Sequence, residues 1–94
     1  MTAATRDNAA RQRYELDTAG GLGFIDYHRS GAVVTMVHAE VPPAMRGRGV
    51  GSELVRGALE LVRARGEKVI PRCSFVVAYF KRHPEMQDLL ARGL

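Results

Sequence analysis

The feature that most constrains this chain is a glycine-rich turn that joins an apolar strand pattern to an amphipathic helix pattern. The turn, Arg-Gly-Arg-Gly-Val-Gly at residues 46–51, follows the β-branched run 32–41 and then Pro42-Pro43. Neither proline can donate a ladder hydrogen bond, so we expect the strand to end there. Over residues 50–65 apolar residues recur every three or four positions, which predicts a helix with one buried stripe. Because the first N–H groups of a helix have no intrahelical partner, this arrangement predicts an anion-binding site.

The other segments predict a small α/β domain with a mixed, α+β character. A Ser-Gly turn at 30–31 indicates a hairpin, and Gly66 is placed to end the first helix in a left-handed conformation. His83-Pro84-Glu85 indicates a new helix start, because proline is favoured at the first helical position. The expected elements are strands at 12–17, 22–29 and 32–41, a helix at 50–65, a strand at 68–73 and a helix at 74–82. This order predicts a mixed sheet with helices packed on it.

The size and composition bound the domain organisation. The chain has 94 residues, 46% of them hydrophobic, which allows one small domain with a core, as a monomer or a homodimer. Residues 1–10 are small and polar, so we expect a flexible N-terminal arm followed by a single domain at 11–94. The sequence contains no apolar run of about eighteen residues and no apolar N-terminal segment, so we expect no membrane span, no signal peptide and a cytoplasmic location. The single cysteine, Cys73, allows no internal disulfide, and we expect no metal site.

The net charge of +4 is concentrated in one segment. Residues 46–72 hold seven basic and three acidic residues, whereas the rest of the chain is neutral. This excess indicates a polyanionic ligand, either the phosphates of a cofactor or a nucleic acid, or else a solvated basic helix face. A nucleic-acid site would interleave aromatic and basic residues. The segment contains no Phe, Tyr or Trp, so a nucleic-acid partner is disfavoured.

Two familiar phosphate motifs do not fit the turn. A nucleotide P-loop requires Gly-Lys-Ser/Thr, whereas Gly51 is followed directly by Ser52. A dinucleotide fingerprint requires a third glycine where this chain has Ser52. The spacing Arg46-x-x-Gly49-x-Gly51 instead resembles the pyrophosphate-binding motif of the GNAT superfamily of N-acetyltransferases, whose pattern is Gln/Arg-x-x-Gly-x-Gly/Ala. The segments 38–43, 68–73 and 83–85 resemble the very short single-domain GNAT-like enzymes, so the resemblance covers about residues 14–90.

The resemblance implies a minimal GNAT-like fold, in which a mostly antiparallel sheet has splayed central strands and helices packed on it. It implies that the chain binds acetyl-coenzyme A and transfers the acetyl group by direct attack of an amine, on a small molecule or a protein. The strand end around Val41 would pair with the pantetheine arm, and the thioester would lie where strands 32–41 and 68–73 splay. The residues expected to bind the pyrophosphate are Arg46, Gly47, Arg48, Gly49, Val50, Gly51 and Ser52.

Acetyl transfer to an amine requires a base for the amine proton, stabilisation of the oxyanion and a proton for the leaving thiolate. His38 and Glu40 are two apart on the expected strand, so they should share one face with Val34 and Met36. Either His38 or Glu40 is a candidate base. The alternative interpretations are a core or rim histidine with one hydrogen bond and a solvated glutamate before the Pro-Pro turn.

Two further residues are candidates for chemical roles. Cys73 ends the 68–73 strand, where it would either carry a transient acyl group or line the site as a small hydrophobic residue. The resemblance implies that Tyr79 is the acid that protonates the thiolate. The family's asparagine seven residues before that tyrosine is Arg72 in this chain. Phe75 is expected in the core or in the lining of the cleft.

The expected acceptor side is reduced. Ordinary GNAT domains carry additional N-terminal helices and C-terminal strands that shape the acceptor pocket, and this sequence leaves no residues for them. The sequence therefore does not identify the acceptor amine. A module that binds coenzyme A or acetyl-coenzyme A with little or no catalysis is the alternative function.

Overall fold

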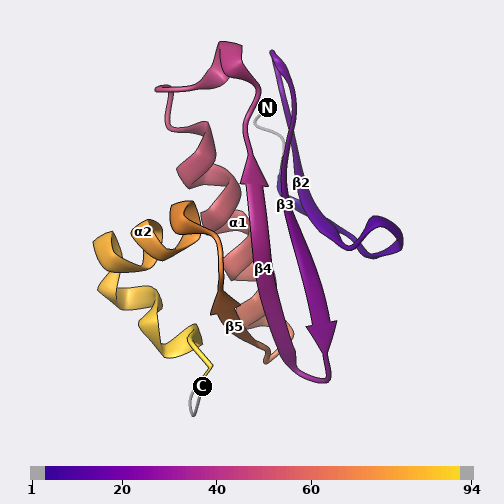
Figure 1. The fold of residues 1–94 in the computed structure, drawn as a ribbon, viewed down its shortest axis with the longest axis vertical. Helices are drawn as coiled ribbons and strands as arrows, with labels where there is room; N and C mark the ends of the chain where they lie inside the picture. The colour runs from indigo at the N-terminus through magenta and orange to yellow at the C-terminus, as the bar shows by residue number, and fades with distance from the viewer. Residues whose placement is uncertain (1–3, 92–94) are drawn as a thin grey trace.

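The computed structural model describes residues 4–91 and shows a five-stranded sheet, with α1 packed behind it and α2 beside β4 and β5 (Figure 1). The strands are β1 (Arg6–Asn8), β2 (Arg13–Thr18), β3 (Gly21–Ser30), β4 (Val33–Glu40) and β5 (Lys68–Pro71). The helices are α1 (Val50–Ala64) and α2 (Ser74–Arg82), and the 3-10 turns are η1 (Ala9–Arg11), η2 (Pro43–Met45) and η3 (Pro84–Leu89). The mixed α/β class is confirmed, while the helix expected to start at Pro84 is a 3-10 turn.

The sheet has the order β1-β2-β3-β4-β5, which is the order of the strands in the sequence. The first four strands are antiparallel, and β5 joins β4 in parallel after the crossover through α1. The β4–β5 ladder runs only from Val33–Lys68 to Met36–Pro71, although β4 continues to Glu40. The last four residues of β4 therefore have no strand partner on the β5 side, and the two strands separate there.

A β-bulge changes which side chains of β4 face the core. Tyr27 pairs with Met36 and the preceding Asp26 pairs with His38, so Val37 is an extra residue on β4. One extra residue reverses the two-residue alternation of side chains along the strand beyond it. Before the bulge the buried side chain is Met36, and beyond it the side chain that packs against the core is Ala39.

The bulge corrects the expectation that His38 and Glu40 share a face with Val34 and Met36. Val34 and Met36 are buried, whereas His38 and Glu40 are exposed, on the face of the sheet opposite α1. The spacing predicted correctly that His38 and Glu40 lie together. It failed for the apolar pair because a strict alternation does not allow for an inserted residue.

The core lies between the sheet and α1. The stripe expected on this helix is buried against β2 and β3, and Gly66 ends the helix with φ 69°, as the sequence predicts. The buried α1 side chains are Leu54, Val55, Ala58, Leu59 and Val62. The sheet contributes mainly Tyr14, Leu16, Ile25, Tyr27, Val34, Met36 and Val69.

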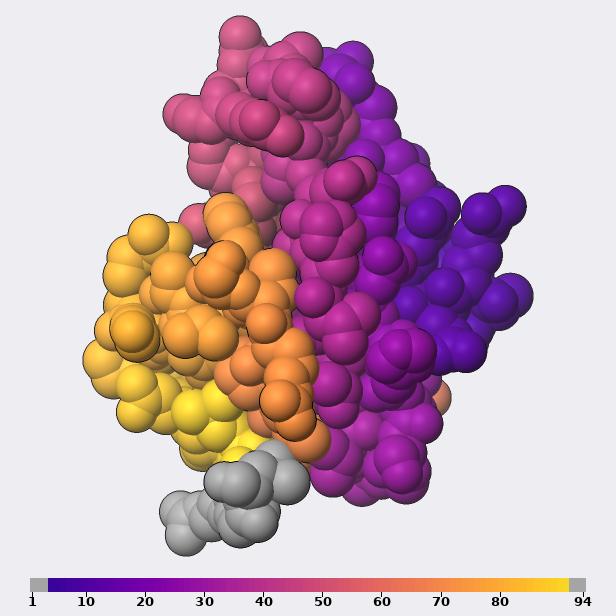
Figure 2. Space-filling model, in the orientation of Figure 1, coloured from indigo at the N-terminus to yellow at the C-terminus, as the bar shows by residue number. Residues whose placement is uncertain are grey.

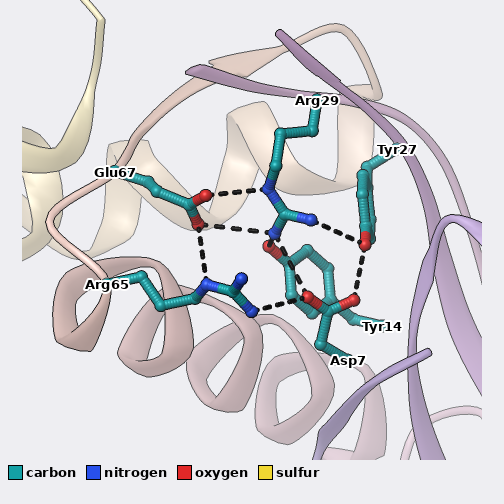
Figure 3. Close-up of polar contacts among 6 residues, drawn as sticks. All are labelled: Asp7, Tyr14, Tyr27, Arg29, Arg65 and Glu67. Atoms are coloured by element: carbon teal, nitrogen blue, oxygen red, sulfur yellow. Dashed lines mark hydrogen bonds and ion pairs between the residues drawn. The ribbon is translucent and has the colours of Figure 1, made fainter. Parts of the chain in front are cut away.

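The N-terminal segment differs from the flexible arm expected for residues 1–10, of which 1–3 lie outside the described residues. Arg6–Asn8 forms β1 and pairs with β2, with Asp7 opposite Tyr14. The strand is held by buried polar contacts around Arg29, which bridges Asp7 on β1 and Glu67 after α1 at 3.1 and 2.7 Å (Figure 3). An edge strand of three residues has little ladder energy of its own, so these charged contacts fix the segment to the domain.

Candidate functional site

A cavity opens where β4 ends, between the loop that precedes α1 and the helix α2. Its volume is about 520 Å³, within the range typical of small-molecule sites. Figure 2 shows the loop and α2 on either side of the end of β4. The lining residues are His38, Ala39, Glu40, Val41, Met45, Arg46, Gly47, Gly49, Gly51, Ser52, Leu54, Phe75 and Arg82. The predicted glycine-rich turn, the start of its helix and the end of β4 are therefore brought to one cavity.

The glycine-rich turn reverses the chain through two left-handed residues. Gly47 has φ 78° and Gly49 has φ 76°, conformations that cost a residue with a side chain about 1–2 kcal/mol. Nothing lies within 4 Å of the position that a Cβ would take at either residue. The backbone of the turn is therefore open to close approach, which a phosphate group requires.

The first turn of α1 presents backbone donors at the same place. The first bond of the helix runs from the Glu53 N–H to the Gly49 carbonyl at 3.1 Å, and no side chain caps the helix. The N–H groups of Val50, Gly51 and Ser52 precede that bond and have no intrahelical acceptor. Together with the positive end of the helix dipole they favour an anion at this end of the cavity.

The helix α2 packs closely against the start of α1. The Phe75 ring lies so near Gly51 that a Cβ there would overlap it, so a larger residue at this position would require the ring to move. Phe75 is 39% exposed, which is unusual for a large apolar side chain, and the exposed part lines the cavity. Of the two positions expected for Phe75, the core and the cleft lining, the structure therefore shows the cleft lining.

The basic residues of segment 46–72 divide into paired and unpaired groups. At the far end of α1, Arg63 lies 2.7 Å from Asp88, and Arg65 lies 3.2 Å from Asp7. Among residues 4–91 no carboxylate pairs with Arg46, and the same holds for Arg48 in the turn. Two arginines that pair with no carboxylate of the described chain therefore lie in the turn at the cavity, which the sequence alone could not show. In the described part of the chain, Lys68 and Arg72 also pair with no carboxylate, but they are outside the cavity lining.

The end of β4 supplies the acid–base candidates. The His38 Nε2 atom lies 3.3 Å from the Glu40 Oε1 atom, and both side chains are more than half exposed. Both line the cavity, with the Phe24 ring 6.3 Å from the His38 ring on the open face of the sheet. The pair can therefore reach a ligand in the cavity and exchange protons with solvent.

The other predicted residues lie near the cavity without lining it. Cys73 is half-buried at the N-terminal cap of α2 and packs against the core. Tyr79 is 2% exposed and stacks on the His83 ring at 4.0 Å. Burial raises the pKa of Tyr79, and the negative charges of Glu85 and Glu60 add to this effect against the opposing charge of Arg56. The side chains of Arg48 and Val50 are also outside the lining.

Several lining residues were not predicted from the sequence. One of them is Arg82, which lies seven residues after Phe75 on α2, a spacing that puts it on the same face of the helix as that expected residue. Met45 and Leu54 give the cavity apolar walls. The seven-residue spacing was a readable signal, but the packing of α2 across the start of α1 was not.

Within residues 4–91, no three His, Cys, Asp or Glu side chains come together to hold a metal ion. None of the helices described is long and apolar enough to cross a membrane.

A mixed sheet whose strands separate beside a glycine-rich helix start is the arrangement that the GNAT resemblance implies. The model of the family described as GCN5-related N-acetyltransferase matches residues 13–89, and the chain belongs to this family. The solution NMR structure of a GCN5-like protein from Staphylococcus aureus superimposes with a TM-score of 0.72 over 99% of this chain and 91% of that one. Its sequence is 22% identical, so the likeness concerns the fold, and the expected GNAT-like architecture is confirmed.

Curated relatives are similar over part of the chain. Protein NATD1 of Homo sapiens is 37% identical over 57 residues, which is 61% of this chain and 50% of the relative. Protein NATD1 of Gallus gallus is also 37% identical over 57 residues and is covered to 52%. The chain thus matches about half the length of these relatives, so their similarity supports the family without assigning a substrate.

Proposed function

We propose that this chain binds acetyl-coenzyme A in the cavity at the end of β4 and transfers the acetyl group to an amine. The observation that carries the proposal is the helix start at Gly49, where open glycine backbone, unpaired N–H groups and an arginine without a carboxylate partner meet in one cavity. Membership of the GCN5-related N-acetyltransferase family supports the same function.

The residues of the turn fit the pyrophosphate of coenzyme A. The N–H groups of Val50, Gly51 and Ser52 would donate to its oxygens, and the Arg46 guanidinium would add charge-assisted hydrogen bonds. The absence of side chains at Gly47 and Gly49 leaves room for the phosphates to reach those donors. Arg48 is outside the cavity lining and its N–H donates to the Met45 carbonyl at 3.3 Å, so it would contribute positive charge near the phosphates rather than a free backbone donor.

The unpaired end of β4 fits the extended pantetheine arm. The Arg72 N–H bonds the Met36 carbonyl at 2.9 Å, and beyond this contact β5 leaves β4. An extended ligand that enters there could add to the strand edge through backbone hydrogen bonds, as peptides do in β-augmentation. Val41, at the end of this edge, lines the cavity and would contact the arm near the phosphates.

The acid–base residues would act on the proton of the acceptor. The cofactor supplies the acetyl thioester, and in direct transfer the amide C–N bond forms, the C–S bond breaks and the amine proton leaves. Glu40 would accept that proton directly or through water, with His38 at 3.3 Å as the second acceptor of the pair. The departing thiolate takes up a proton, which water in the open cavity would supply; Tyr79 would be the donor only if the ligand reached it, since it is buried outside the cavity lining.

A coenzyme A-binding module with little catalysis is the second candidate. The observation that favours it is the dispersal of the chemical residues, because Cys73 and Tyr79 do not line the cavity that contains His38 and Glu40. A module of this kind would bind the cofactor through the same turn. The two candidates differ only in turnover.

The experiment that separates them measures thiol release from acetyl-coenzyme A with a panel of amines and peptides, together with calorimetric binding of the cofactor. We expect turnover, and we expect Glu40→Gln to lower kcat about 100-fold, within the range of general base catalysis, while cofactor affinity stays unchanged. Glu60→Gln is the control, because Glu60 is an exposed α1 carboxylate outside the cavity. Binding without release for every acceptor would support the module, and full activity of Glu40→Gln would refute the base assignment.

Cys73 has its own test. If it carries an acyl group, mass spectrometry after incubation with acetyl-coenzyme A will show an adduct that hydroxylamine removes, since a thioester is labile to it. We expect no adduct and retained activity in Cys73→Ala, because the side chain packs on the core outside the cavity lining. A labile adduct together with loss of activity in Cys73→Ala would establish a covalent route instead of direct transfer.

A further inference from the structure

Arg82 brings a second positive charge to the cavity, from a helix other than α1. It is the last residue of α2 and lies seven residues after Phe75, so the two are on one face of the helix. Both line the cavity together with Arg46 of the turn. The cavity wall therefore has two basic side chains on separate elements, one in the turn before α1 and one on α2.

The Arg82 side chain makes no charged contact that would stabilise the fold within the described residues 4–91. Two arginines of α1, by contrast, pair with carboxylates: Arg56 with Glu60 at 3.7 Å and Arg63 with Asp88 at 2.7 Å. Glu85, the nearest carboxylate along the chain, lies 3.1 Å from the Nδ1 atom of His83. Within the described residues 4–91 the Arg82 guanidinium makes no ion pair and no hydrogen bond. An unpaired guanidinium on a cavity wall is available to an anion of the ligand.

Coenzyme A carries more phosphate than the start of α1 can bind. The three free N–H groups of Val50, Gly51 and Ser52 converge at one helix end and suit one pyrophosphate. The 3′-phosphate of the ribose is a separate group with a charge near −2 at neutral pH, and planar guanidinium forks match phosphate oxygens. Resting on the proposed function, we propose that Arg82 binds the 3′-phosphate and makes the chain select coenzyme A over its dephosphorylated form.

The test compares two commercially available ligands that differ by that phosphate. Calorimetric titrations of the full chain with coenzyme A and with 3′-dephospho-coenzyme A give the affinity ratio. We expect wild type to bind coenzyme A about tenfold more tightly, equivalent to one charge-assisted contact. In Arg82→Gln the affinity for coenzyme A falls about tenfold, the affinity for dephospho-coenzyme A is unchanged, and the ratio approaches one.

A neighbouring lysine supplies the matched control. Lys81 is exposed on α2 and is outside the cavity lining, so Lys81→Gln removes the same charge without touching the site. This variant should keep the wild-type ratio. An equal loss for both ligands in Arg82→Gln, or the same loss in Lys81→Gln, overturns the proposal in favour of a general electrostatic effect. If wild type binds coenzyme A and dephospho-coenzyme A with equal affinity, the role of Arg82 is overturned but the cofactor site is not. If neither ligand binds, the proposed function itself is overturned.

Discussion

Arg29 shows how single residues decide the stability of this small fold. Its guanidinium donates to Glu67 at 2.7 Å, to the Tyr27 hydroxyl at 3.0 Å and to Asp7 at 3.1 Å, and it ties β1 and β3 to the end of α1 (Figure 3). The side chains of Asp7 and Glu67 are 10% and 8% exposed. Arg29→Met would leave two largely buried carboxylates with only Arg65 as a counter-charge.

We therefore expect Arg29→Met to destabilise the protein by about 3 kcal/mol, because uncompensated buried charges are costly. Urea denaturation followed by circular dichroism measures the change. The control is Arg63→Met, which breaks an ion pair with Asp88 whose side chains are 48% and 56% exposed and should cost about 0–1 kcal/mol. Equal losses in the two variants would contradict the structural role of the Arg29 contacts.

Glu15 makes stability depend on acid pH. Burial alone would raise the pKa of its carboxyl, but hydrogen bonds from Arg13 at 2.6 Å and Asn8 at 3.1 Å outweigh burial and lower it. A lowered folded-state pKa gives stability that is present above the unfolded value of about 4.3 and is lost as the pH falls through the folded value. Unfolding free energies between about pH 6 and pH 2 should therefore fall more steeply in wild type than in Glu15→Gln. Parallel curves would contradict this contribution.

At the scale of the element, the turn before α1 has a function that can be separated from its stability. Gly49→Ala places a Cβ on a residue with φ 76°, and Gly31→Ala does the same at φ 58° in the distant β3–β4 hairpin. Neither Cβ meets another atom within 4 Å, so each substitution should cost about 1–2 kcal/mol of backbone strain. Only Gly49→Ala should weaken coenzyme A binding, by about tenfold or more, because only its methyl group blocks the phosphate path. Calorimetry and thermal unfolding of the pair measure both effects.

The elements also show what the sequence could and could not predict. Local signals, such as the glycine turn and the stripe on α1, placed the helix and the cavity correctly. The bulge at Val37 was not predictable, because it depends on how β3 and β4 pair and leaves the residue pattern unchanged. The strand β1 was missed because residues 6–8 show no apolar alternation and are held by Arg29, far away in the sequence. Arg82 was missed because its place at the cavity depends on how α2 packs.

At the scale of the whole molecule, the two ends of the domain differ in how their charged residues are paired. At one end, the paired charges of Arg29, Arg63 and Arg65 fasten the strands and helices together. At the other end, the β4–β5 ladder stops, the turn before α1 is open and the arginines there have no carboxylate partner among residues 4–91. The backbone separation thus coincides with arginines that have no carboxylate partner in the described part of the chain, and we expect a polyanionic ligand to bind there.

Titration calorimetry of the full chain with acetyl-coenzyme A tests that expectation most directly. We expect saturable binding of one cofactor per chain, with a dissociation constant between about 1 μM and 1 mM, the usual range for enzyme substrates. The affinity should fall at least about tenfold in Gly49→Ala and stay unchanged in Gly31→Ala, since only the first residue belongs to the turn. No saturable heat at millimolar cofactor, or equal binding by both variants, would contradict the assignment of the cavity as the cofactor site.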